Sequence, residues 1–207
     1  MLNKIRDYLD FAGLHYRNPD KAGEEREKMM AFRHKGQEAR KAFTELAKAF
    51  QASHPEWQLQ QTSQWMSQAQ RLRPHFWAYL QRDGQVTEPM MAIRLYGTPA
   101  DFGISLEVSF IERKKDEQIL DKQAKVLELP VVEGIYYLVY SNGESHKVEA
   151  NEENRRTLRE KLRNQEVRKV LVKSDVSLIE NQSVEAILEK LEDAYTRLLP
   201  YYEVTRK

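Results

Sequence analysis

The chain contains no cysteine among its 207 residues. Disulfide bonds and thiolate nucleophiles are therefore excluded, and any metal site would have to be built from histidine or carboxylate side chains. The five histidines do not follow the spacing of zinc ligands, so we expect neither a metal nor a cofactor. They are His15, His34, His54, His75 and His146.

Long apolar runs and an excess of one charge are also missing. Nothing approaches 18 consecutive apolar residues, and the opening segment MLNKIRDYLDF lacks an apolar stretch of signal-peptide length. We therefore expect a soluble, cytoplasmic protein of bacterial type without a membrane partner. Because 33 Lys and Arg residues balance 32 Asp and Glu residues, no global field attracts nucleic acid.

Familiar catalytic motifs are absent as well. The eight glycines form neither GxGxxG nor a P-loop, and no GxSxG occurs. Asp101, followed by Glu112 and Lys114, resembles the Asp…Glu-x-Lys pattern of metal-dependent nucleases. If 103–112 is one unbroken strand, the two carboxylates lie roughly 35 Å apart, so this alternative requires a sharp break at Gly103. We assign no catalytic residue, and the sequence leaves open whether the chain is an enzyme.

Periodicity and turn residues predict an α+β fold with a mainly antiparallel sheet of about five to six strands. We expect one domain over 1–207, with a helical arm over 1–55 and a sheet-and-helix body over 74–207. Segment 56–70 is hard to place. The expected helices cover 2–12, 20–53, 115–128, 151–164 and 183–200, where Pro200 ends the last one. The expected strands cover 75–82, 90–97, 103–113, 135–140, 144–149 and, as a sixth strand or an edge, 167–173.

The long helix carries a heptad-like apolar seam, and two interpretations of it stay open. The seam packs lengthwise on the sheet or on the first helix, or it makes the chain a structural, dimerising protein. In the second case Phe43, Leu46 and Phe50 form a homodimer interface. The seam consists of Met29, Phe32, Gly36, Ala39, Phe43, Leu46 and Phe50.

Alternation along the first three strands separates two sheet faces. One set is wholly apolar and predicts the main core: Phe76, Ala78, Leu80, Met91, Ile93, Leu95, Ile104, Leu106, Val108 and Phe110. The other set is unusual for a solvated face, because it combines aromatic rings with a guanidinium and a carboxylate. It consists of His75, Trp77, Tyr79, Arg94, Tyr96, Ser105, Glu107 and Ser109.

This second set has two interpretations. In the first, the long helix covers half of the face and Arg94 forms a cross-strand ion pair with Glu107. In the second, Trp77 and Tyr79 stack on a ligand, Arg94 pairs with its negative group, and Glu107 orients Arg94. A small anionic ligand and nucleic acid both fit such a face. The candidate ligand-binding residues are His75, Trp77, Tyr79, Arg94, Tyr96 and Glu107.

A basic segment offers a second candidate for nucleic-acid contact. Residues 151–173 hold eight basic side chains and four acidic ones. On a helix, Arg156, Arg159 and Arg163 gather on one side, where they form a solvated face or contact phosphates.

The block from Trp77 to Phe110, with the segments AIRLYG at 92–97 and DFGISLEVSF at 101–110, resembles a small uncharacterised bacterial family. Some of its members carry a glucose-6-phosphate dehydrogenase label. The resemblance implies a common fold over most of the chain. It does not imply that activity here, because this chain lacks the nicotinamide-binding glycines and a base. The segment GIYYLVY at 134–140 is also similar to the DNA-binding amino-terminal domains of some modification-dependent restriction systems.

Together these patterns favour a non-catalytic binding module that uses the aromatic, arginine-bearing sheet face. The metal-dependent nuclease and the dimerising protein remain the alternatives.

Overall fold

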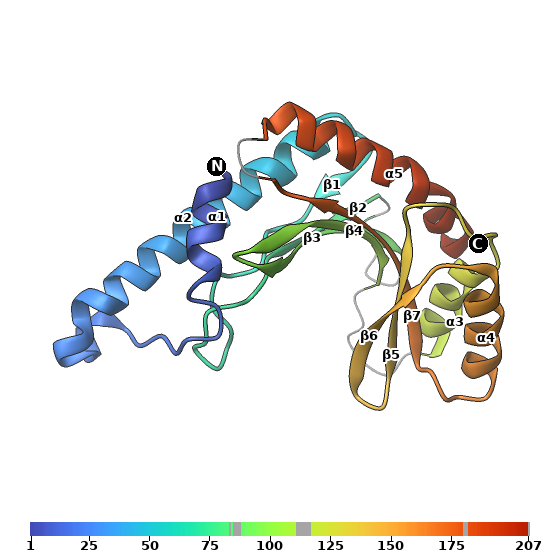
Figure 1. Cartoon of the computed structure of the whole chain (residues 1–207), viewed down its shortest axis with the longest axis horizontal. Coiled ribbons are helices and arrows are strands. Elements are labelled where there is room, and N and C mark those ends of the chain that lie inside the picture. The colour runs from blue at the N-terminus through green and yellow to red at the C-terminus, as the bar shows by residue number, and fades with distance from the viewer. Residues whose placement is uncertain (83, 85–87, 111–116, 180–181, 207) are drawn as a thin grey trace.

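The computed structural model describes residues 1–82, 84, 88–110, 117–179 and 182–206 (Figure 1). Its strands form one seven-stranded sheet in the order β1-β2-β3-β4-β7-β5-β6, and all neighbouring strands are antiparallel. The α+β prediction is confirmed, with more strands than expected. The strands are β1 Gln58–Leu59, β2 Trp77–Gln81, β3 Met90–Thr98, β4 Asp101–Ser109, β5 Tyr136–Ser141, β6 Glu144–Glu149 and β7 Lys169–Ser177.

The helices follow the predicted segments with shifted ends. They are α1 Leu2–Leu9, α2 Arg26–Ala52, α3 Glu117–Ala124, α4 Glu152–Arg163 and α5 Val184–Arg206, with short 3-10 turns η1 Pro19–Lys21, η2 Gly23–Glu25 and η3 Lys125–Leu127. The long helix starts later than expected, because Gly23 takes a φ of +57° and η1 and η2 replace its first turns. Asn151 caps α4, since its Oδ1 accepts from the Asn154 N–H at 2.8 Å.

The prediction that Pro200 ends the last helix is wrong. The α5 helix continues through Pro200 to Arg206. A proline inside a helix removes one backbone hydrogen bond. Here the turns beyond it are held by tertiary packing, because Tyr201 and Tyr202 are fully buried and the Tyr201 hydroxyl donates to the Pro130 carbonyl at 2.7 Å.

The last strand is not the edge that one of the sequence alternatives allowed. It lies in the middle of the sheet, where β7 pairs with β4 on one side and β5 on the other. Val170 and Val172 point into the core and have no exposed surface. A short edge strand that the sequence did not reveal, β1, extends the sheet beyond β2.

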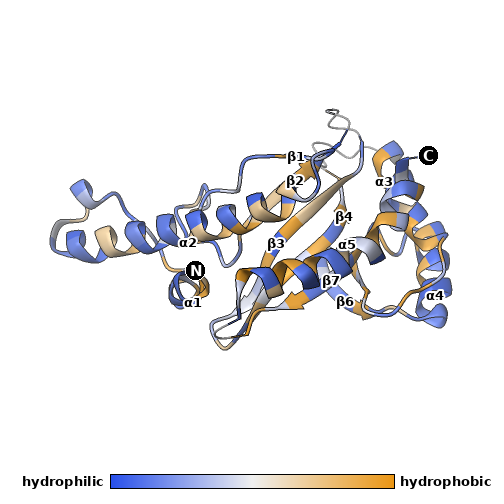
Figure 2. Cartoon of the chain, turned by 90° about the horizontal axis from the view of Figure 1, so that it is seen from above, coloured by the Kyte–Doolittle hydropathy of each residue, from blue (hydrophilic) through white to orange (hydrophobic). Residues whose placement is uncertain are grey.

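The core lies between one sheet face and the helices α1, α2, α4 and α5, all of which contribute buried side chains to the same apolar cluster. Figures 1 and 2 show α2 and α5 lying across the sheet. The predicted apolar set is confirmed, because every member is at most 5% exposed. We call this side the core face.

The homodimer interface predicted through Phe43, Leu46 and Phe50 is wrong. All three side chains are completely buried within the chain. The Phe43 ring packs 5.8 Å from the ring of Phe76, which lies on the core face beside β2. The Phe32 ring of the same seam packs 5.2 Å from the ring of Phe11, just after α1. The seam therefore attaches α2 to both the sheet and the α1 region, and its buried side chains are not available to a second copy.

None of the helices in the described part of the chain combines the length and apolarity that crossing a bilayer requires.

Candidate functional site

The opposite side of the sheet carries rings and charged groups, with Ala92, Leu138 and Leu171 lying among them. We call this side the polar–aromatic face. The strand registers place its members side by side: Trp77 pairs with Arg94, Arg94 with Ser105, and Ser105 with Asp175. In Figure 1 no described helix lies across this side. Its ring-bearing and charged members, with Ser105, are Trp77, Tyr79, Arg94, Tyr96, Asp101, Glu107, Tyr136, Tyr140, Lys147, Glu149, Lys169, Lys173 and Asp175; His75 lies directly before β2.

This placement decides one point that the sequence left open. The first interpretation held that the long helix covers half of this face. That is wrong, because α2 packs on the core face and does not cover Trp77 or Tyr79. The ion pair that the same interpretation predicted is confirmed, since Arg94 and Glu107 do form a cross-strand ion pair.

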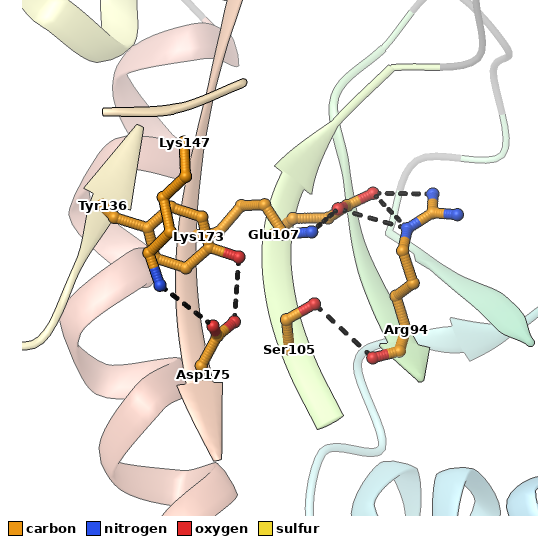
Figure 3. Close-up of polar contacts among 7 residues, drawn as sticks. All are labelled: Arg94, Ser105, Glu107, Tyr136, Lys147, Lys173 and Asp175. Carbon is orange, nitrogen blue, oxygen red and sulfur yellow. Dashed lines mark hydrogen bonds and ion pairs between the residues drawn. The ribbon is translucent and has the colours of Figure 1, made fainter. Parts of the chain in front are cut away.

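A buried carboxylate lies at the centre of the face (Figure 3). Glu107 is 1% exposed, and it contacts Arg94 through Nε at 3.2 and 3.3 Å and through Nη2 at 2.9 Å. Lys173 Nζ lies 3.0 Å from its other oxygen. Burial alone would raise the pKa of Glu107, but Arg94 and Lys173 outweigh it and hold that pKa below its usual range. The trio therefore carries one net positive charge.

A second polar group adjoins this trio on β5, β6 and β7 (Figure 3). The Tyr136 hydroxyl donates to Asp175 Oδ1 at 2.9 Å, and Lys147 Nζ lies 3.5 Å from Asp175 Oδ2. Lys147 Nζ also lies 3.8 Å from the centre of the Tyr136 ring. Burial, with the Asp175 charge beside the phenol, raises the pKa of Tyr136, so the hydroxyl stays protonated and remains a donor.

On the β2 side the Trp77 indole is surrounded by basic groups. The guanidinium carbons of Arg73 and Arg94 lie 4.8 and 5.3 Å from its ring centre, within the range of cation–π contacts. The His75 ring lies 5.6 Å away. Burial lowers the pKa of His75 to about 4, with help from the positive charges of Arg94, Arg73 and Lys173. His75 is therefore neutral at pH 7, and the field around it is mainly positive.

Gly103 leaves space for the ring of Tyr96, another of the candidate residues from the sequence. Tyr96 lies directly opposite Gly103 across β3 and β4. A Cβ atom on Gly103 would come within 2.4 Å of the Tyr96 hydroxyl and of the Val176 carbonyl oxygen. Burial raises the pKa of Tyr96 to about 12, with contributions from Asp175 and Asp101, so this phenol is neutral as well.

All six candidate residues from the sequence thus lie together on one face. The basic helix does not join them: α4 packs into the core cluster through Leu158, while Arg156, Arg159 and Arg163 are exposed.

The nuclease alternative receives no support from the described residues. Strand β4 runs without a break through Gly103, although that hypothesis requires a sharp bend there. Glu112 and Lys114 lie outside the described residues. Within those that are described, no group of three His, Asp or Glu side chains could hold a metal ion.

The members of the face that lie on β5, β6 and β7 were not predicted from the sequence. Tyr136, Tyr140, Lys147, Lys173 and Asp175 come from strands whose alternation is visible in the sequence. Their membership depends on β7 pairing with β4, which joins two distant parts of the chain. Applying the period of two to 136–140 and 169–175 would have placed Tyr136, Tyr140, Lys169, Lys173 and Asp175 on one side, together with Leu138 and Leu171.

Chemically, the face can bind but offers no evident nucleophile. Glu107 occupies Nε and Nη2 of Arg94 and fixes the guanidinium beside Trp77, while Nη1 is not engaged by Glu107. A guanidinium held in this way presents fixed donors to an anionic group. The neighbouring rings offer apolar surface to a planar group.

Comparison of the chain with protein-family models and with curated protein sequences found no match to either.

Proposed function

We propose that this chain is a non-catalytic binding module whose polar–aromatic face takes an anionic ligand that also carries a planar ring. The observation that carries the proposal is the pairing of Trp77 with a fixed Arg94 guanidinium, 5.3 Å from the ring centre, on a side of the sheet that no described helix crosses. A nucleotide combines a planar base with a phosphate, joined by a sugar, so nucleotides are the ligand class that this pairing fits best.

The energetic balance favours exchange of the internal contacts for ligand contacts. A cation over an exposed ring contributes about 0.5–1 kcal/mol. Stacking of a base on an aromatic side chain contributes about 1–3 kcal/mol. A base can therefore displace Arg73 from the Trp77 ring at a net gain, and the displaced guanidinium remains close enough to reach a phosphate.

Glu107 supports this function by positioning Arg94. Without the carboxylate, the guanidinium would lose its bidentate partner, and two cations would face each other across β4. The buried carboxylate thus keeps Arg94 and Lys173 side by side, where both contribute to the positive field.

The test is isothermal titration calorimetry of the whole chain with ATP, UTP and pyrophosphate. We expect both nucleotides to bind more tightly than pyrophosphate, which has no ring. Trp77→Leu should weaken nucleotide binding alone, whereas Arg94→Gln should weaken all three ligands. Arg159→Gln, which removes an exposed arginine on α4, is the matched control and should change nothing.

The proposal is wrong if neither the nucleotides nor the oligonucleotide used below binds. It is also wrong if binding occurs but is unchanged in both Trp77→Leu and Arg94→Gln. Thermal unfolding of each variant checks that a loss of binding is not a loss of folding.

A further inference from the structure

The ring-and-cation arrangement around Trp77 occurs twice more on the same face. Tyr136 has Lys147 Nζ 3.8 Å and Lys173 Nζ 6.0 Å from its ring centre. Tyr140 has the cationic groups of Arg168 and Lys169 at 5.9 Å each. Tyr136 and Tyr140 lie on the same side of β5, because strand residues two apart or four apart share a face. The face therefore presents three rings, each with two cations in reach.

The rings are too far apart for one small ligand. Trp77 lies on β2 and Tyr136 on β5, four strand spacings away in the order of the sheet. At about 4.8 Å per spacing the strands that carry the two rings are roughly 19 Å apart along the sheet. A mononucleotide does not span this separation, whereas about five to six stacked nucleotides of one strand do, at about 3.4 Å each.

The charges on this surface match a polyanion. Six cations surround the three rings: Arg73, Arg94, Lys147, Arg168, Lys169 and Lys173. Four carboxylates share the face: Asp101, Glu107, Glu149 and Asp175. Arg94 and Lys173 pair with Glu107, and Lys147 pairs with Asp175, so these ten groups together leave a net charge of +2 on the face.

Ring stacking also selects the form of the polyanion. In a duplex the base faces are stacked on one another and are not available to side chains. Every base of a single strand can present its ring face to an aromatic side chain, while interleaved Arg and Lys follow the phosphates.

We propose that the polar–aromatic face binds single-stranded nucleic acid, with Trp77 at one end of the path and Tyr136 and Tyr140 at the other. This inference rests on the proposed function and extends it from one nucleotide to a strand that crosses the sheet.

The experiment is fluorescence anisotropy of the whole chain with fluorescein-labelled (dT)12 over a series of salt concentrations. We expect (dT)12 to bind at least ten times more tightly than dTTP. The logarithm of the association constant should fall with the logarithm of salt concentration, with a slope of about −0.7 per phosphate contacted. Lys147→Gln changes a side chain that is 62% exposed, so the fold should tolerate it, and we expect the slope to become shallower by about 0.7.

The rings are tested separately from the charges. Tyr140→Leu and Trp77→Leu should each weaken (dT)12 binding roughly 5- to 150-fold, the range that corresponds to one stacked base. Lys161→Gln on the exposed surface of α4 is the matched charge control and should leave both affinity and slope unchanged.

Failure of this inference is distinguishable from failure of the proposed function. If dTTP binds and depends on Trp77, but (dT)12 binds no more tightly and ignores Tyr140→Leu and Lys147→Gln, the single-strand inference is wrong and the proposed function stands. If (dT)12 duplexed with (dA)12, or polyphosphate of equal charge, binds as tightly as (dT)12, stacking on the rings is refuted. If nothing binds, both proposals are wrong.

Discussion

Replacement of Glu107 by glutamine tests the account of the buried charge cluster. The substitution keeps the size of the side chain but removes the negative charge that pairs with both Arg94 and Lys173. Lys173 is 5% exposed, so its ammonium would remain largely buried without a charged partner. Arg94, whose side chain is 24% exposed, can turn towards water more easily.

The expected cost follows from this burial. Removing one partner of a buried ion pair costs about 3–5 kcal/mol, mainly because the other charge stays uncompensated. For a chain of this length, that loss lowers the thermal midpoint by about 6–20 °C. Adding Lys173→Met removes the uncompensated ammonium, so the double variant should be more stable than Glu107→Gln alone. Glu149→Gln, the same change at an exposed position of the same face, should cost less than about 0.5 kcal/mol.

The contribution of Glu107 to stability should depend on pH in a definite direction. The pKa of Glu107 is lower in the folded chain than its ordinary value of 4.5. Its stabilising effect is therefore fully present above pH 4.5 and is lost as the pH falls through the folded pKa. The difference in unfolding free energy between the wild type and Glu107→Gln should shrink as the pH drops below about 4.5.

Urea unfolding followed by circular dichroism measures these differences, with unchanged slopes as the condition for comparing midpoints. A loss below about 1 kcal/mol for Glu107→Gln would refute the reasoning. Strict additivity of Glu107→Gln and Lys173→Met would refute it as well, because directly paired charges must show coupling.

Three further predictions concern packing and protonation. Phe43→Glu should lower the unfolding free energy by at least about 3 kcal/mol, because it removes a core ring and buries a charge; a stably folded variant with a smaller particle size in light scattering would contradict this. Gly103→Ala should cost about 1–3 kcal/mol in urea unfolding, because its Cβ would press on the Val176 carbonyl oxygen; an unchanged midpoint would contradict the tight packing there. The NMR titration midpoint of His75 should lie near pH 4, and stability should rise with pH between about 4 and 6.5, because the unfolded chain binds the proton more tightly; a midpoint near 6.5 would contradict the burial of the ring.

Local patterns were enough to predict the two faces of β2, β3 and β4. The period of two assigned Phe76 and Ile93 to the core and Trp77 and Arg94 to the other side, and the structure bears this out. Asn-Gly is a strong hairpin signal in any sequence, and Asn142-Gly143 does join β5 to β6, with φ of +51° and +86° at the two residues. These features depend on neighbours in sequence, so sequence alone could determine them.

Features that depend on distant contacts could not be predicted in this way. The seam of α2 has the same heptad-like pattern whether it meets a sheet or a second helix, and only the structure shows that Phe43 is buried against Phe76. The central place of β7 results from its pairing with both β4 and β5. This pairing brings Lys173 to Glu107 and joins the Tyr136 region to the predicted site. The continuation of α5 beyond Pro200 likewise depends on tertiary packing.

The most direct test of the central claim uses the three tryptophans of the chain as internal reporters. In a two-dimensional ¹⁵N–¹H NMR titration with (dT)12, the account predicts that the indole N–H signal of Trp77 shifts and saturates. The signal of Trp57, which is 1% exposed and donates to the Tyr195 hydroxyl, should stay in place. A Trp77 signal that does not move while (dT)12 is bound, or a shift confined to Trp57 and Trp65, would place binding elsewhere and contradict a role for the polar–aromatic face.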